Sequence, residues 1–261
     1  MTTTSLLLTS LLLLVPIFIS YKEKLHIAKD LIIAAIRAVI QLVLIGFLLE
    51  FVFKVQEAWI VLTLMLVIMI NAAANTRKRA SSIQRHVFWV SFIAIITGAV
   101  LSLGGVLLTG AINFTPNEII PVAGMVGSNG MIAINLSYQN LDRIFTKETE
   151  SIEAKLSLGA APSLAAKDAI RESIKVAIVP TIDSVKTYGL VSIPGMMTGL
   201  IIAGVPPLQA IKFQLMVVFI HTTATIISAL VATYLSYRQF FNYRHQLIQI
   251  KKKKQIPLNR C

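Results

Sequence analysis

The chain has 261 residues, of which 56% are hydrophobic and only 14% are charged, and its formal net charge is +12. Soluble domains of this size carry roughly 25% charged residues, so the composition excludes an ordinary soluble domain and indicates an integral membrane protein. A strong positive charge can also indicate nucleic-acid binding. Here, however, lysine and arginine lie between long apolar runs, as the positive-inside rule requires, and we expect no nucleic-acid partner.

Apolar segments of membrane-spanning length follow one another along the chain. Each is close to the roughly 20 residues that cross about 30 Å of hydrocarbon. The seven segments are residues 4–20, 31–53, 58–74, 88–109, 118–138, 181–203 and 208–234. The first resembles a signal peptide, but it lacks a basic start and a small-residue cleavage pattern, so we expect a retained helix. The sequence predicts an all-α membrane protein with one domain, residues 1–261.

The basic residues indicate the orientation of these segments. They gather in residues 21–30, 75–87 and 139–180 and in the tail, 238–261, whereas Lys54 is the sole basic residue of the other loops. The positive-inside rule then predicts seven crossings, with the N-terminus outside and the C-terminus inside. The run Lys251 to Lys254 is expected to be solvated or attracted to anionic lipid at the inner surface.

Several polar residues lie inside the apolar segments. Arg37 and Gln41 are four residues apart, and Asn129 lies in a stretch rich in small residues that follows Pro121. Such groups face either neighbouring helices or a water-filled path. The stretch after Pro121 is typical both of a broken helix that lines a site and of a tight helix crossing. His221 either binds a metal or relays a proton, or is hydrogen-bonded between helices.

The sixth segment contains both an acid and a base. Its apolar run, Gly189 to Gly204, has only 16 residues, so a spanning helix must include Asp183 and Lys186 in the cytoplasmic leaflet. On a continuous helix Met197 lies about 40° from Asp183 and Lys186 about 60° from it. The pair either neutralises itself or lines a substrate path. Met196 and Met197 either offer soft metal ligands or pack in the core.

The segment Glu153 to Pro162, EAKLSLGAAP, resembles the start of the EAA loop, the coupling helix that docks ABC permeases onto their ATPase. We expect Gly159 to end one helix and residues 160–166 to begin the next. The resemblance assigns Glu153, Leu158, Gly159 and Ala160 to ATPase coupling. Pro180 stands farther from the glycine than the proline of that loop does, and a helix lying on the membrane is the alternative.

Longer stretches are similar to the iron-export permease family (FetB-type), which includes plant aluminium-sensitivity permeases. The resemblance implies a permease in the plasma (inner) membrane that exports iron or another metal ion. It also implies a separate ATPase subunit and, by analogy, a homodimer. The matching stretches are Arg37–Leu42, Asn71–Asn75, Ile120–Met125, Leu156–Ala160, Pro180–Gly204, Tyr237–Arg238 and His245–Leu247.

The chain has no G-x-x-x-x-G-K-[ST] phosphate loop, so we expect no ATP hydrolysis by the chain itself and no cofactor. Two alternatives remain. One is a secondary transporter that needs no ATPase and uses Asp183 as a proton-coupling acid. The other is a membrane-embedded enzyme, which no nucleophile–base pair or metal cluster in the sequence supports.

Overall fold

The computed structural model describes residues 3–55, 57–77 and 86–248, and within these ranges every regular element is a helix. Five helices there are long and apolar enough to cross a membrane. They are α3 (Ala28–Val55), α4 (Ala58–Thr76), α5 (Val87–Leu108), α6 (Pro116–Lys147) and α11 (Pro207–Ser236). The predicted all-α membrane class is therefore confirmed, and each of these helices overlaps one of the predicted segments almost completely.

The contacts separate the chain into two compact units, Met1–Gln56 and Glu57–Cys261. The first, the N-terminal unit, contains α1 (Thr3–Ser10), η1 (Leu11–Leu13), α2 (Leu14–Lys22) and α3. A turn with left-handed backbone at Lys24 and His26 reverses the chain before α3. The apolar helix Leu8–Lys22 is shorter than the five candidates, so the count of seven crossings stays a prediction.

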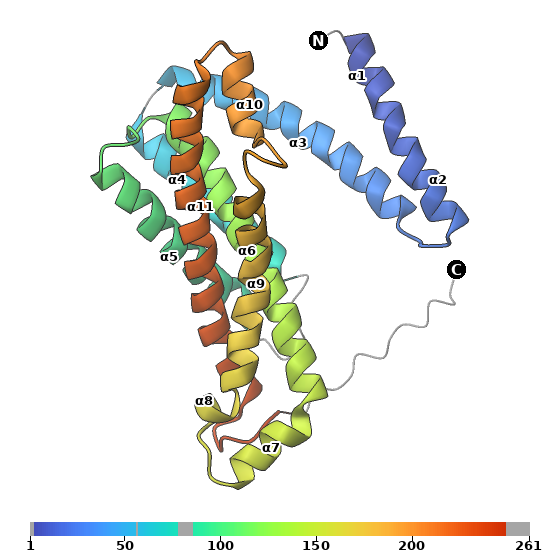
Figure 1. Cartoon of the computed structure of the whole chain (residues 1–261), viewed down its shortest axis with the longest axis vertical. Coiled ribbons are helices and arrows are strands. Elements are labelled where there is room, and N and C mark those ends of the chain that lie inside the picture. Colours follow the sequence, from blue (N-terminus) through green and yellow to red (C-terminus); the bar gives the residue numbers. More distant parts are fainter. Residues whose placement is uncertain (1–2, 56, 78–85, 249–261) are drawn as a thin grey trace. The chain divides into compact units, whose positions relative to one another are not determined.

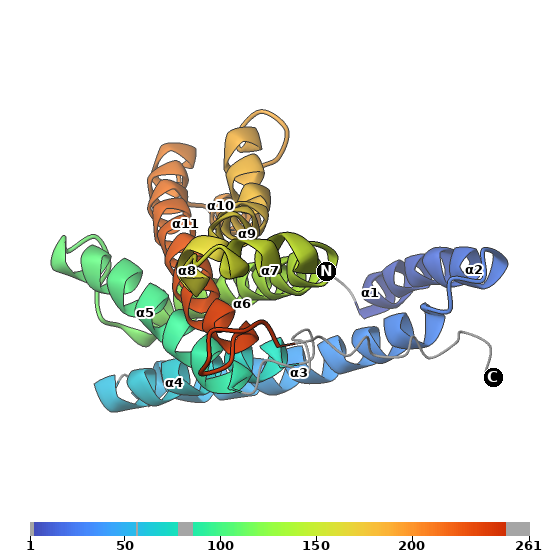
Figure 2. The same ribbon diagram turned by 90° about the horizontal axis from the view of Figure 1, so that it is seen from below.

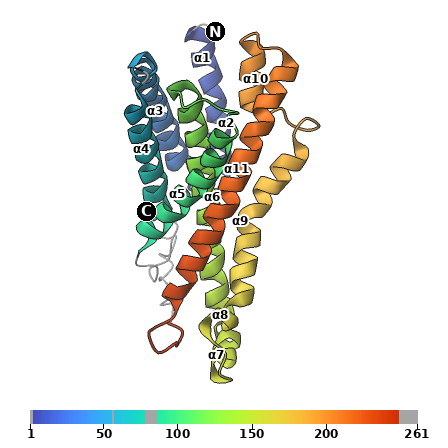
Figure 3. The same ribbon diagram turned by 90° about the vertical axis from the view of Figure 1, so that its left-hand side faces the viewer.

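The second unit, called the bundle unit here, is built around α11, which packs against α5, α6 and α9 (Lys167–Thr187) (Figure 1, Figure 3). Small residues allow these helices to approach closely. A Cβ added at Gly98 in α5 would lie 2.5 Å from Ser228 Oγ and 2.7 Å from the Ala224 carbonyl oxygen of α11. Only glycine permits this approach without a shift of the neighbouring helix.

Buried hydroxyl groups in the bundle unit are hydrogen-bonded across helices. Thr76 Oγ1 donates to Ser91 Oγ at 2.8 Å, and Ser91 Oγ lies 3.0 Å from the Tyr138 hydroxyl. Ser137 and Thr233 are joined in the same way between α6 and α11. These bonds place the end of α4, the start of α5 and the second half of α6 at one end of the bundle unit, called the basic end here.

Two short helices, α7 (Thr149–Ser157) and α8 (Pro162–Ala165), cover the basic end (Figure 2). Beneath them Phe145 stacks on Phe240 of η2 (Tyr237–Phe240), with ring centroids 4.3 Å apart. The chain after η2 folds back, and the Ile248 N–H donates to the Phe240 carbonyl at 2.8 Å. The first part of the basic segment, Leu141 to Ile170, and the start of the tail thus lie at one end. The run Lys251 to Lys254 lies outside the described residues.

The predicted continuous helix over residues 181–203 is wrong. Helix α9 ends at Thr187, residues 188–194 are not helical, and α10 (Gly195–Ile202) is only eight residues long. Gly189 adopts a φ of +82°, and Pro194 has no N–H to donate, so neither continues a helix. The calculated angle between Asp183 and Met197 therefore does not apply. The residues 188–194 are called the helix break from here on.

The broken-helix alternative for the fifth segment is also wrong. Helix α6 runs without interruption through Pro121. This proline lies in the second turn, so α6 loses a single hydrogen bond near its start and continues. The interruption that the sequence suggested after Pro121 is found instead at residues 188–194.

Candidate functional site: a cavity at the helix break and an exposed elbow

A cavity of about 340 Å³ opens in the bundle unit beside the helix break. Residues from α6, α9, the break, α10 and α11 line it. Its polar and sulfur-containing lining residues are Met125, Asn129, Thr181, Ser184, Tyr188, Met196, Gln214 and His221. Asn129 and Met196 were both predicted as path residues. They are far apart in sequence, yet both line this cavity.

Contacts between the helices show where along the bundle unit this cavity lies. Helices α6 and α11 run in the same direction, and Ser137 contacts Thr233 while Ala133 clusters with Ala229. In both contacts the residue number on α11 is 96 higher than the number on α6 (233 − 137 and 229 − 133). Met125 therefore lies level with His221. This level is near the middle of both the apolar segment 118–138 and α11. The cavity therefore lies about halfway along the bundle unit.

Two lining residues each carry a buried polar atom that has no hydrogen-bond partner among the described residues. They are Oε1 of Gln214, a residue 8% exposed, and Nδ1 of His221, a residue 7% exposed. A buried polar group without a partner costs about 1–3 kcal/mol, so both atoms, which lie just behind the cavity surface, would gain a partner if their side chains rotated towards a molecule in the cavity. A hydrogen bond from His221 Nδ1 to another helix, one of the sequence alternatives, is absent from the described residues.

Gln214 was missed by the sequence analysis. The available signal was its spacing of seven residues from His221, which puts both side chains on one face of α11. A lone glutamine near the start of an apolar helix gives no other indication that it faces a cavity.

The predicted acid–base pair forms, but it does not line the cavity. Lys186 Nζ lies 3.4 Å from Asp183 Oδ1, and the two side chains are 69% and 60% exposed. Met197 also lies outside the lining, next to the lining residue Met196. Asp183 and Lys186 precede the break on a face of α9 that the bundle unit leaves open.

Arg37 and Gln41, the remaining predicted path residues, belong to the N-terminal unit. They share one shallow surface of α3 with Ile33, Ile36 and Ile40. Their role in a path stays a prediction.

The segment 149–165, called the elbow here, projects at the basic end. Gly159 has a φ of +86°; its N–H donates to the Leu156 carbonyl at 2.9 Å, and the Ala160 N–H donates to the Lys155 carbonyl at 3.1 Å. These two bonds form a Schellman motif, which confirms that Gly159 ends a helix. Leu158, beside it, is 89% exposed, and Glu153 on α7 is also exposed.

The elbow is held to the helices behind it. Ile152 is 2% exposed within the aromatic cluster at the basic end. Lys155 Nζ lies 3.0 Å from Asp168 Oδ2, and this hydrogen bond and charge lower the pKa of the Asp168 carboxyl below its ordinary value. The contact ties α7 to the first turn of α9.

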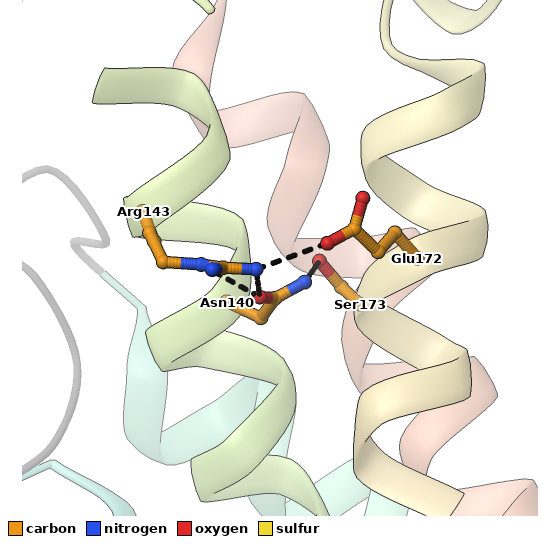
Figure 4. A network of polar contacts seen from close by, with 4 residues as sticks. All are labelled: Asn140, Arg143, Glu172 and Ser173. Carbon is orange, nitrogen blue, oxygen red and sulfur yellow. Dashed lines mark hydrogen bonds and ion pairs between the residues drawn. The ribbon is translucent and has the colours of Figure 1, made fainter. Parts of the chain in front are cut away.

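A network of polar contacts, called the clamp here, joins α6 to α9 (Figure 4). Asn140 Nδ2 donates to Ser173 Oγ at 3.2 Å, and the Arg143 guanidinium donates to Asn140 Oδ1 at 2.6 Å and to Glu172 Oε1 at 3.0 Å. Elbow, α6 and α9 are thus connected at the basic end, and α9 continues from there to the break.

Long apolar helices around a mid-depth cavity are the architecture of a multi-pass membrane permease. The sequence matches the family described as "Uncharacterised protein family (UPF0014)" over residues 3–241, and the chain belongs to this family.

Three relatives extend this assignment over most of the chain. The chain is 47% identical to the probable iron export permease protein FetB of Escherichia coli (strain K12), over 97% of this chain and 98% of the relative. It is 35% identical to the UPF0014 membrane protein YjkA of Bacillus subtilis (strain 168), over 94% and 98%. It is 31% identical to the protein ALUMINUM SENSITIVE 3 of Arabidopsis thaliana, over 90% and 85%. No solved structure matches the chain.

Proposed function

We propose that the chain is the permease subunit of an ABC transporter in the plasma (inner) membrane, where it exports iron or another metal ion. A separate ATPase subunit hydrolyses the ATP. The observation that carries this proposal is the course of α9. It starts beside the elbow at Lys167 and ends at Thr187, where the break begins to line the cavity. A helix of 21 residues is about 32 Å long and transmits movement from its base to its tip.

The nature of the cargo is supported by the relatives and by the lining. The E. coli relative carries iron export in its name. The lining offers two thioether sulfurs and an imidazole, which suit d-block metals. Metal here is cargo, so a permanently occupied site is not required.

The elbow is the proposed docking surface for the ATPase. Leu158 lies at the tip of the elbow. Its apolar side chain is hardly packed against the bundle unit, since 89% of the residue is exposed. It lies beside Gly159, which has no side chain, and Ala160, whose side chain is one methyl group, so the turn leaves room for a groove to close around it. Glu153 stands on the same helix and adds a charged contact at the rim.

The acid–base pair supports a homodimer around a water-filled path. Asn140 contacts Ser173, and Ala133 clusters with Ala177, in the antiparallel pair α6 and α9. This register puts Asp183 level with the middle of the apolar segment 118–138. Charges at that depth cost several kcal/mol in lipid. A second copy that encloses water opposite Asp183 and Lys186 removes this cost, and the pair then lines the path.

The orientation follows from the basic end. Arg143, Lys155 and Lys167 lie there together with Arg238, and the positive-inside rule puts this end in the cytoplasm. The N-terminus is then outside after seven crossings. The secondary-transporter alternative has less support, because Asp183 is paired with Lys186 and lies outside the cavity lining.

The docking proposal is tested with the substitution Leu158→Glu. The exposed side chain has little to lose within the permease, so insertion and thermal stability should not change, whereas complex formation with the ATPase should fall at least tenfold. Tyr243→Glu is the matched control, because Tyr243 is 84% exposed in the tail at the same end. Equal complex formation by Leu158→Glu and wild type, measured by co-purification from the membrane, would reject docking at the elbow.

A further inference from the structure

The two polar atoms without partners belong to residues two helical turns apart on α11. Gln214 and His221 are seven residues apart on α11, which puts their backbones about 10.5 Å apart along the helix axis. Metal–ligand bonds to nitrogen, oxygen and sulfur are only about 2.0–2.3 Å long. Each atom therefore marks its own place along the cavity wall.

A methionine lies level with each of these places. The offset between α6 and α11 puts Met125 level with His221. At the other end, α10 and the first turns of α11 form a hairpin through Gly204, whose φ is +93°. Met196 lies seven residues before the C-cap of α10, and Gln214 seven residues after the start of α11, so the hairpin puts Met196 level with Gln214. Both methionines line the cavity.

The donors select the chemical class of the ion. No aspartate or glutamate belongs to the lining, so the cavity lacks the carboxylates that Mg²⁺ and Ca²⁺ require. Thioether sulfur and imidazole nitrogen favour borderline and soft d-block ions, whereas hard ions prefer oxygen. A low-valent ion such as Fe²⁺ fits this donor set better than Al³⁺ does.

We propose that the cavity contains two successive cation stations along α11. The inner station pairs Met125 Sδ with His221 Nδ1, and the outer station pairs Met196 Sδ with Gln214 Oε1. This inference rests on the proposed metal permease function and specifies its cargo as a borderline-to-soft d-block cation. The step from the inner to the outer station leads away from the basic end, which is the direction of export.

The test uses purified full-length permease without ATPase and anaerobic equilibrium dialysis against Fe²⁺. Wild type should bind two Fe²⁺ per chain, and a hundredfold excess of Mg²⁺ should leave them bound. His221→Ala and Met125→Leu should each weaken one site at least tenfold, and Gln214→Leu should weaken the other. Met196→Leu should act like Gln214→Leu, whereas Met197→Leu, a neighbour outside the lining, should bind as wild type does.

The methionine-to-leucine variants keep side-chain volume, so they fold even if a substitution at His221 does not. Unchanged Fe²⁺ binding in Met125→Leu and Met196→Leu, displacement by Mg²⁺, or an equal loss in Met197→Leu would each overturn the stations. ATP-driven transport with the ATPase is measured separately. Normal transport by a variant that lacks both sites contradicts the stations alone, whereas no transport by wild type contradicts the permease proposal itself.

Discussion

At the scale of residues, some side chains that line the cavity can be predicted from the local sequence and others cannot. Asn129 and Met196 were predicted as path residues, because a polar group in a membrane segment needs a partner or water and a thioether can bind a soft metal ion. Gln214 was not, because nothing in its own neighbourhood says that the cavity lies on its side of α11. Its role depends on α6 and on the helix break, which only the tertiary structure brings to it.

Asp183 and Lys186 show the opposite situation. Their spacing of three residues predicted an ion pair, and the pair forms at 3.4 Å. The prediction that they share a face with Met197 fails, because the helix between them is interrupted at residues 188–194. Which surface an acid–base pair faces cannot be obtained from spacing once the helix ends.

The double variant Asp183→Asn/Lys186→Met tests whether this pair lines a path. It leaves no unpaired charge, so it should insert and form dimers as wild type does, yet its transport rate should fall at least tenfold. The measurement is transport in vesicles that contain the partner ATPase. The single variant Lys186→Met is the comparison, since it leaves Asp183 unpaired. Full transport by the double variant would show that the pair has only a structural role.

At the scale of elements, the elbow was predictable and the break was not. A glycine after a short polar helix is a local signal, and Gly159 indeed takes the left-handed conformation that ends α7. The break lies within an apolar run whose hydropathy is that of a spanning helix. Hydropathy reports how long and how apolar a segment is. It therefore cannot distinguish one continuous crossing helix from two helices, α9 and α10, that are separated by an irregular turn.

The clamp between α6 and α9 gives an element-scale prediction. Asn140→Ala should lower stability by about 1–3 kcal/mol, because Asn140 is 5% exposed and its loss leaves the buried Ser173 without this partner. Glu172→Ala is the matched control in the same network. Its ion pair with Arg143 is half exposed, so its loss should cost only about 0–1 kcal/mol.

The measurement for the clamp is the thermal unfolding midpoint of both purified variants in one detergent. A larger shift for Glu172→Ala than for Asn140→Ala would mean that the exposed ion pair, rather than the buried amide, holds the two helices together.

At the scale of the whole molecule, the class of protein was fixed by composition and by the spacing of apolar segments. Five of the seven predicted segments are helices of spanning length and composition. Within the bundle unit, Arg143, Lys155 and Arg238 lie beside or within the segments that pack together at the basic end, whereas the number of crossings and their orientation stay predictions. The division into two units could not be read from the sequence, because both contain apolar helices of similar composition.

The central claim is that docking at the elbow changes access to the cavity through α9. Ser184 is the residue to probe, because it lines the cavity near the tip of α9 and its side chain is exposed. After replacement of Cys261, a single cysteine is introduced by Ser184→Cys. A second chain with Asn113→Cys, on the loop at the opposite end from the elbow, serves as the control.

The deciding measurement is the rate at which a membrane-impermeant thiol reagent, added outside, labels these cysteines with the ATPase bound. We predict that ATP changes the labelling rate of Ser184→Cys at least fivefold, leaves Asn113→Cys unchanged, and has no effect when Leu158→Glu is also present. A labelling rate of Ser184→Cys that is the same with and without ATP and ATPase would contradict the account.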